Sequence, residues 1–403
     1  MVKRNLAVII ASFCTVLIGF AVRTGYGVLL PEMLPSLRMS KTEAGLVYGS
    51  FFVAYTVFSP VLGLLADRIN IRSLLTLFSV ILGVGTLLMG YSSSLIEATF
   101  FFTVAGIGSA ACWSPVVPLV QRWTSDRRRG MTLAIVDMGA SAGVALASLI
   151  IPLIVVAYDW RMGWKGLGTL ALIIAGINYL LVRDRRTEET KLLDREFRGP
   201  LNGASSRISG KILRDRKFML IGTSYLLIGF SVLVPLTFIS TYAAQELMFR
   251  YDVATRVITT IALASMVGKL VLGHLSDSMG RIRTIIVCQI LIAMSNLGIV
   301  YFPKLLAINL SMAIFGFGHG AVWPLYALCA PDYFSKSQAG LIVGLWTLFL
   351  GIGFILSPII SGWIADVTGT FVWSFALAIV TAMISNFLLL LGGKKNYFLM
   401  PSG

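Results

Sequence analysis

Twelve apolar segments, each long enough to cross a bilayer, set the main limit on how this chain can fold. A helix needs about 20 apolar residues to span the roughly 30 Å hydrocarbon core, and the mean hydropathy of the 403 residues is +0.86. Backbone polar groups find no partners in lipid, so segments of this length predict helices. We therefore expect an all-α membrane protein with twelve transmembrane helices, near residues 5–30, 43–66, 73–91, 95–121, 131–157, 164–183, 217–245, 253–275, 284–302, 305–330, 339–364 and 372–392.

The surplus of positive charge does not indicate a nucleic-acid partner. The chain has 33 Lys and Arg against 18 Asp and Glu, a formal net charge of +15. Loops on the side of the N-terminus hold 24 of these basic residues and the opposite loops hold seven, while Arg23 and Lys269 lie inside predicted helices. The positive-inside rule then predicts a multi-pass protein of the plasma (inner) membrane with both termini in the cytoplasm.

The sequence offers little for a catalytic or metal centre. Cys14, Cys112, Cys288 and Cys329 fall within predicted helices without metal-ligand spacing, and the chain has only two histidines. No nucleophile elbow or phosphate-binding loop is found in the sequence. We therefore expect no enzyme, no metal and no cofactor. The N-terminal apolar stretch is too long for a signal peptide and is expected to be the first transmembrane helix.

The chain resembles itself at a constant separation of 210 residues. IGFAV at 18–22 recurs as IGFSV at 228–232, and Trp113 recurs as Trp323. Six predicted helices thus repeat as six, and the two sets run in the same direction because six is an even number. We expect two six-helix bundles related by a parallel internal repeat, with a basic cytoplasmic linker between them, over residues 1–183, 184–216 and 217–403.

Two loops at this separation carry the signature of a known family. GLLADRINIRS at 63–73 and GHLSDSMGRIR at 273–283 resemble the motif of the Major Facilitator Superfamily after its second and eighth spans. In physical terms, Gly lets helices approach closely, and Asn70, which replaces an expected Gly, tolerates a left-handed turn. The resemblance implies a conformational-switch role for the loop residues Gly63, Asp67, Arg68, Arg72, Gly273, Asp277, Gly280 and Arg281.

Four ionisable residues, Arg23, Asp137, Lys269 and His319, fall inside predicted spans. A charge near the bilayer centre costs at least about 2.5–3.5 kcal/mol, so it indicates a partner, a wet cavity or a ligand. Lys269 and Arg23 could instead reach the interface along their long side chains. Asp137 is too short for that and needs a cation or a proton. The superfamily resemblance implies that all four lie on helices with access to the central cavity.

The repeat shows that none of these four groups is duplicated. The residues 210 positions away are Leu233 for Arg23, Ser59 for Lys269, Thr347 for Asp137 and Ser109 for His319. Structural residues of a repeat should occur twice, whereas the site of an asymmetric solute requires polar groups in one half only. The pattern favours a solute site.

A closer resemblance concerns three of the spans. FSVLVPLTFISTY at 230–242 and RRRGMTLAIVDMGASAG at 127–143 are similar to spans 7 and 5 of the monocarboxylate transporter family. Lys269 matches the basic position of its span 8, which the related oxalate and formate exchangers share. The resemblance implies that Lys269 binds the substrate carboxylate. The animal carriers have Asp one turn earlier, where this chain has Ser265, so proton coupling does not carry over directly.

Asp137 is the first candidate for a proton carrier. It lies at a depth similar to that of Lys269, so the two are predicted to form a charge pair that a substrate carboxylate and a proton replace. His319 is the second candidate, or else a hydrogen-bonding packing residue. The predicted substrate contacts are Lys269, Arg23, Tyr26, Trp113, Ser265, Phe238 and Trp346. For the aromatic residues among them, packing between helices is the alternative role.

We expect a secondary transporter that moves small organic anions, monocarboxylates first, with a proton and by rocker-switch alternating access. The expected partners are the anionic substrate, a proton and membrane lipids, and the expected state is a monomer. Three alternatives stay open: a proton-coupled drug or metabolite efflux antiporter, a dicarboxylate or anion exchanger, and a non-transporting membrane sensor. Two cavity cations suit anions better than the cationic drugs that many efflux antiporters export.

Overall fold

The computed structural model describes residues 2–66, 69–124, 129–183, 212–334 and 339–392, and these ranges contain helices and no β-strand. They contain twelve spans, each a single helix or a run of two or three consecutive helices, that are long and apolar enough to cross a membrane. The N-terminal half consists of α1 (Val2–Ser36), α2 (Lys41–Ala66), α3 (Ile71–Met89), α4 (Leu95–Ser109), η1 (Ala110–Cys112), α5 (Val116–Trp123), α6 (Arg129–Ala157) and α7 (Trp160–Leu181).

The C-terminal half repeats this order. It consists of α10 (Arg216–Thr241), the short π-helix η3 (Tyr242–Glu246), α11 (Tyr251–Met279), α12 (Arg281–Tyr301), α13 (Leu305–Tyr333), α14 (Ala339–Thr368) and α15 (Val372–Gly392). The span made of α4, η1 and α5 in the first half corresponds to α13, which is continuous in the second. The predicted all-helical, twelve-span fold class is confirmed.

The helix bounds carry the 210-residue repeat. Helices α2, α3, α4 and α6 begin at residues 41, 71, 95 and 129, and α11, α12, α13 and α14 begin 210 positions later, at 251, 281, 305 and 339. Much of the predicted linker, 184–211, falls outside the described residues. Its limits therefore stay a prediction, although α7 ends at Leu181 and α10 begins at Arg216.

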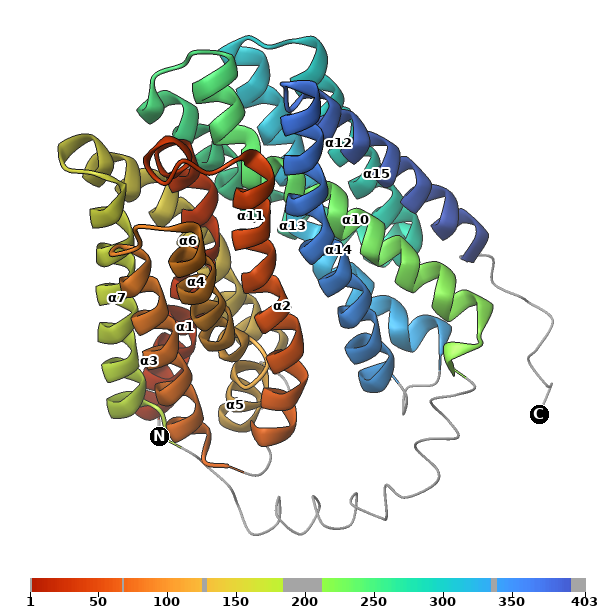
Figure 1. The fold of residues 1–403 in the computed structure, drawn as a ribbon. Helices are drawn as coiled ribbons and strands as arrows, with labels where there is room; N and C mark the ends of the chain where they lie inside the picture. The colour runs from red at the N-terminus through yellow and green to blue at the C-terminus, as the bar shows by residue number, and fades with distance from the viewer. Residues whose placement is uncertain (1, 67–68, 125–128, 184–211, 335–338, 393–403) are drawn as a thin grey trace.

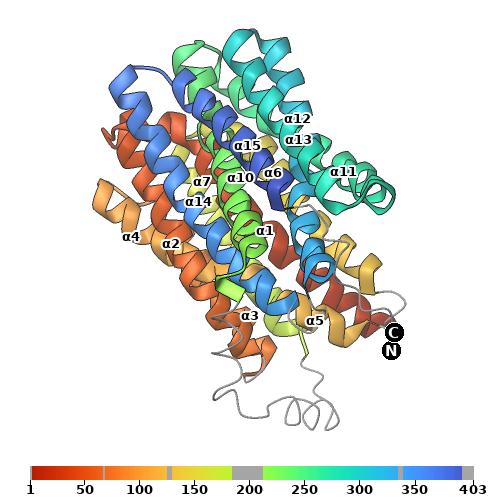
Figure 2. The ribbon, with the colours of Figure 1, turned by 90° about the vertical axis from the view of Figure 1, so that its right-hand side faces the viewer.

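The two halves stand side by side and meet mainly at one end (Figure 1). Helix α1 begins and α15 ends at the other end, which we call the terminal end; the meeting end is the distal end. Contacts between the halves run along three helix pairs: α2 with α14, α6 with α11, and α1 with α10. Figure 2 shows the first pair, with α14 in blue beside α2 in orange-red.

Glycines bring the helices of each half together at repeated places. A Cβ on Gly106 would lie 2.4 Å from the carbonyl oxygen of Phe51, and one on Gly316 would lie 2.4 Å from that of Ile261. These glycines and their contacts are 210 residues apart, so both halves use the same close crossing of their second and fourth spans. Such crossings drive helix association in lipid, where burial of apolar surface gives little.

We predict that Gly106→Ala destabilises the protein strongly while Gly176→Ala does not. The added methyl of the first variant meets backbone, which cannot rotate away, and overpacking of this kind costs about 1–3 kcal/mol. Around Gly176, also inside a helix, an added Cβ has no neighbour within 4 Å. Melting temperatures of the two purified variants in detergent test this. Equal melting temperatures would contradict the assignment of Gly106 to a packed crossing.

Two expectations about the loops were wrong. Gly63 and Gly273 have nothing within 4 Å of an added Cβ, so they mark no close helix contact here, because the halves diverge at this end. Asn70 has φ −60° and ψ 117°, an extended conformation in which its side chain caps α3 by accepting a hydrogen bond from Arg72 N. Among the described residues of the two loops, a positive φ occurs at Gly280, with φ 89°.

Candidate functional site

An ion pair between α6 and α11 joins the two halves. The ammonium of Lys269 lies 2.5 Å from Oδ2 of Asp137 and 3.5 Å from the carbonyl oxygen of the same residue. The Lys269 and Asp137 side chains are 20% and 30% exposed. The predicted charge pair is therefore present, and Lys269 extends to Asp137 on the facing helix rather than along its own helix to the lipid head groups.

The repeat gives an internal control for this pair. The corresponding crossing of α2 and α14 has Ser59 and Thr347 in place of Lys269 and Asp137. Ser59 bonds Ser114 at 2.7 Å, and Thr347 donates to the carbonyl oxygen of Val343 at 2.8 Å. Each hydroxyl is thus satisfied within its own half. The Lys269–Asp137 ion pair has no counterpart at the equivalent positions of the other crossing, so the fold itself does not require it.

Ser265 and His319 form a short hydrogen-bonded chain one turn from Lys269. Ser265 Oγ donates to the carbonyl oxygen of Gly316 at 3.0 Å and lies 3.4 Å from His319 Nδ1. Trp323 Nε1 donates to His319 Nε2 at 3.2 Å. Because Nε2 accepts from Trp323, a neutral His319 carries its proton on Nδ1, which can then donate to Ser265 Oγ. All three side chains then have hydrogen-bond partners. This geometry favours the packing alternative for His319 over that of a proton carrier.

Arg23 has aromatic neighbours in place of a counter-ion. Its guanidinium carbon lies 4.8 Å from the ring centre of Phe52, 5.7 Å from that of Phe20 and 4.6 Å from that of Phe354, which belongs to the other half. Among the described residues, no carboxylate oxygen lies within 4 Å of its nitrogens. The Arg23 side chain also shares a hydrogen bond with Tyr48. A guanidinium has five N–H donors, so without a carboxylate partner it keeps donors for another group.

A small recess lies beside this guanidinium. Its volume, about 20 Å³ for the centre of a water molecule, is room for a water or two and no more. The recess brings together Arg23 and Trp113, two of the predicted contacts. Its walls are Gly19, Phe20, Arg23, Phe51, Tyr55, Ser109, Cys112 and Trp113.

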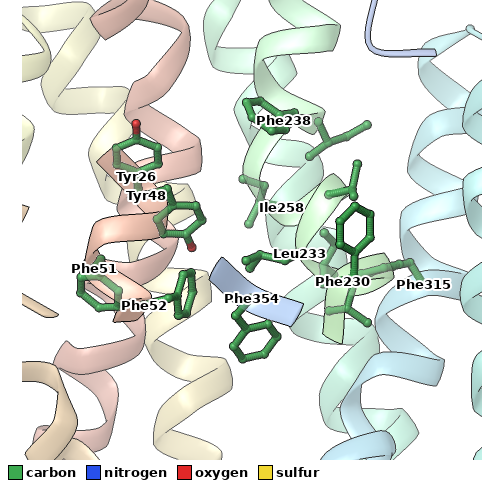
Figure 3. Close-up of a cluster of buried hydrophobic side chains, with 14 of the residues drawn as sticks. Tyr26, Tyr48, Phe51, Phe52, Phe230, Leu233, Phe238, Ile258, Phe315 and Phe354 are labelled. Carbon is green, nitrogen blue, oxygen red and sulfur yellow. The ribbon is translucent and has the colours of Figure 1, made fainter. Parts of the chain in front are cut away.

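Three of the predicted substrate contacts lie in packed interiors instead. Tyr26 is fully buried, donates to the carbonyl oxygen of Ala44 at 2.6 Å and stacks on neighbouring rings of its own half (Figure 3). Phe238 is fully buried and stacks on Phe371 at 4.6 Å. Trp346 is 1% exposed and donates to the carbonyl oxygen of Phe218. Their burial corrects the expectation that they face the cavity, because none offers surface to a solute here.

The predicted switch loops make contacts within their own halves. Asp67 and Arg68 lie outside the described residues. The guanidinium of Arg72 lies 4.2 Å from the ring centre of Tyr179, and Arg281 pairs with Asp277 at 2.7 Å, one turn earlier in sequence. No contact of these described side chains crosses between the halves. Their part in conformational switching stays a prediction.

The distal end holds a polar network that the sequence did not indicate. Asp366 of α14 accepts hydrogen bonds from the backbone N–H groups of Lys41 at 3.0 Å and Thr42 at 2.8 Å, and from the Thr42 hydroxyl. Glu246 pairs with the Lys41 ammonium at 3.3 Å and also accepts from Phe371 N. Two carboxylates of the C-terminal half thus hold the positive N-terminus of α2. This network could not be predicted, because the sequence does not show which helix an acidic residue at the end of a span contacts.

The described part of the chain holds no group of three or more His, Cys, Asp or Glu side chains placed to bind a metal. Apart from the network at the distal end, the polar groups of the predicted site are the cations Lys269 and Arg23, the Asp137 carboxylate, the His319 imidazole and nearby hydroxyls. Such a set can bind and release an anion and can exchange a proton.

Comparisons with known proteins agree with this architecture. A family model described as Major Facilitator Superfamily matches residues 11–256 and 221–397. A structure of a bacterial homologue of the human lysosomal transporter Spinster, in an inward-facing and occupied conformation, superposes with a TM-score of 0.78 at 15% identity, covering 96% of each chain.

Similar sequences include proteins with different printed functions. The membrane sensor protein UhpC of Salmonella typhimurium is 24% identical over 93% of this chain and 89% of its own. The hexuronate transporter of Bacillus subtilis is 23% identical over 93% of this chain and 92% of its own. Monocarboxylate transporter 12-B of Danio rerio is 22% identical over 82% of this chain and 75% of its own.

Proposed function

The chain belongs to the Major Facilitator Superfamily, and we propose that it is a secondary transporter of small organic anions. It is an integral multi-pass membrane protein, and proteins of this superfamily are not enzymes. The observation that carries the proposal is the Lys269–Asp137 pair, which links the halves at one of two equivalent crossings. Arg23, without a carboxylate partner among the described residues, supplies a second cation.

The proposed cycle exchanges the partners of this pair. A substrate carboxylate takes the place of Asp137 at Lys269, and Asp137, left without its cation in a partly buried position, takes up a proton. Both charges at the crossing are then neutralised, and the halves can rock past each other. One carboxylate and one proton move together in this scheme, which makes the step electroneutral.

The direction of opening follows from the charge pattern. We propose that the terminal end lies in the cytoplasm, which the basic loops on that side support. Because the halves meet at the distal end, this conformation would then be inward-facing. The polar network at Asp366 and Glu246 is then the closed outer gate. The plasma (inner) membrane remains the proposed location.

The substrate class is proposed from the site and the relatives together. Two cations suit a carboxylate, and the related hexuronate and monocarboxylate transporters are named for carboxylated solutes. Sugar acids and simple monocarboxylates are therefore the two groups to compare, with monocarboxylates the narrower proposal. Proteoliposome uptake of labelled lactate, pyruvate, formate, oxalate, glucuronate and galactonate, with and without a pH gradient, tests this. Uptake of none of these, by correctly inserted protein, would contradict it.

A membrane sensor is the second candidate, because UhpC aligns over 93% of the chain. A sensor would bind an anion without turnover. Binding of a panel anion to purified protein, combined with no uptake or counterflow, would favour it. Efflux of a cationic drug driven by the same gradient would instead favour the antiporter alternative.

We predict that Asp366→Ala opens the outer gate. The variant loses three hydrogen bonds and a charge at the N-terminus of α2, and the charge interaction alone is worth about 0.3–1 kcal/mol. A Cys at position 236, beside Gly27 of the other half, should react several-fold faster with a membrane-impermeant maleimide in a background lacking the native cysteines. The matched control is Asp252→Ala, whose carboxylate pairs with Arg250 and Arg256 of its own half. Equal labelling rates would contradict the gate.

A further inference from the structure

Phe354 of the C-terminal half contacts Arg23 of the N-terminal half. Its ring centre lies 4.6 Å from the Arg23 guanidinium carbon and 5.1 Å from the ring centre of Phe52. Its ring centre also lies 5.8 Å from that of Trp323, which belongs to the C-terminal half. Figure 3 shows Phe354 on α14, between the N-terminal cluster that includes Phe52 and the rings of the C-terminal half. The side chain is 4% exposed.

The recess beside Arg23 is too small for an organic anion as it stands. Its volume of about 20 Å³ for water centres leaves no room for a carbon skeleton. The recess is walled by the N-terminal half, and Phe354 lies over the guanidinium from the C-terminal half. Movement of Phe354 would therefore add room at the guanidinium beyond the recess.

Of the three described rings that lie over the Arg23 guanidinium, Phe354 alone belongs to the other half. Phe52 is fully buried and packs against Tyr48 and Phe51, at ring distances of 4.9 Å and 5.4 Å. Phe20 lies on the same helix as Arg23. Phe354 belongs to α14 of the C-terminal half, so a shift of that half carries the ring away from Arg23.

We propose that Phe354 is the movable wall of the Arg23 site and that its side-chain size limits the anion that this site accepts. The inference rests on the proposed transport of organic anions. A carboxylate forms charge-assisted hydrogen bonds to the guanidinium, which are stronger than the contact with the ring face, so an arriving anion displaces the ring. The body of the anion then occupies the space that the ring leaves.

Uptake of two anions of different size by proteoliposomes tests this inference. Lactate is the small probe and glucuronate the large one. In Phe354→Leu the kcat/KM ratio of glucuronate to lactate should rise at least fivefold, mainly through a lower KM for glucuronate, and Phe354→Ala should raise it further. Phe349→Leu is the matched control, because Phe349 lies on the same helix but packs against Phe218. Its ratio should equal that of the wild type.

The outcomes separate this inference from the function on which it rests. If the wild type carries either probe and the ratio in Phe354→Leu is unchanged, the inference is wrong and the proposed function stands. If the wild type carries neither probe nor any other panel anion, the proposed function fails and the inference fails with it. Lactate uptake by Phe354→Leu reports that this variant is correctly folded. If the variant takes up no lactate, competition binding replaces uptake as the measurement. An affinity for glucuronate relative to lactate that equals that of the wild type would then also count against the inference.

Discussion

Lys269→Ala should abolish carboxylate uptake, lowering kcat/KM at least a hundredfold. The ammonium is the proposed receptor for the substrate carboxylate, and a methyl group offers no charge or hydrogen bond in its place. The variant also leaves the Asp137 carboxylate without its partner at 2.5 Å. Loss of one partner of a buried pair costs about 3–5 kcal/mol, an upper limit here because both side chains are partly exposed. Uptake in proteoliposomes with matched protein content measures the effect.

A double variant separates substrate binding from the structural role of the pair. In Lys269→Ala with Asp137→Asn neither member of the pair is left as an unpaired charge, so stability and insertion should recover. Uptake should remain absent if Lys269 receives the substrate. Restored uptake in the double variant would show that Lys269 serves only to neutralise Asp137. Lys269→Arg should keep partial uptake, since it retains the charge with a different hydrogen-bonding shape.

Asp137→Asn should uncouple uptake from the pH gradient. With one proton moved per carboxylate, a gradient of one pH unit supports about tenfold accumulation, because a factor of ten corresponds to about 1.4 kcal/mol. An amide cannot carry that proton, so the variant should equilibrate the solute without concentrating it. Counterflow, which needs no net proton movement, should persist.

The repeat provides the control for this variant. Thr347 occupies the position equivalent to Asp137 and donates to Val343 of its own helix, so Thr347→Asn should keep wild-type accumulation. Gradient-driven accumulation that survives in Asp137→Asn would place the proton carrier elsewhere. His319 would not be a ready substitute, because its Nε2 already accepts from Trp323 in this conformation.

The depth of a residue along its helix could be predicted from the sequence. The side of the helix on which its side chain lies could not. Counting residues from the loops gave similar depths for Asp137 and Lys269, and the structure joins them. Tyr26, Phe238 and Trp346 lie in equally apolar helices, where no polar face shows which side points to the interface. Membrane helices are apolar on the lipid side and on the packed side alike, so the usual pattern of a buried face is missing.

Contacts between the halves were missed for a related reason. The repeat relates equivalent places in the two bundles, but it does not say how far apart the bundles stand at each end. Asp366 at the N-terminus of α2 and Phe354 over Arg23 depend on that arrangement. For the same reason Gly63 and Gly273 were wrongly expected at close contacts, because in this conformation the halves diverge at the terminal end.

Proton uptake on substrate binding tests the central claim most directly. Purified protein in weakly buffered detergent solution, with a pH-sensitive dye, is mixed with a saturating carboxylate that the uptake panel has identified. Exchange of partners at the Lys269–Asp137 pair predicts about one proton taken up per bound anion, and none in Asp137→Asn. Tight anion binding by the wild type with no proton uptake would contradict the exchange.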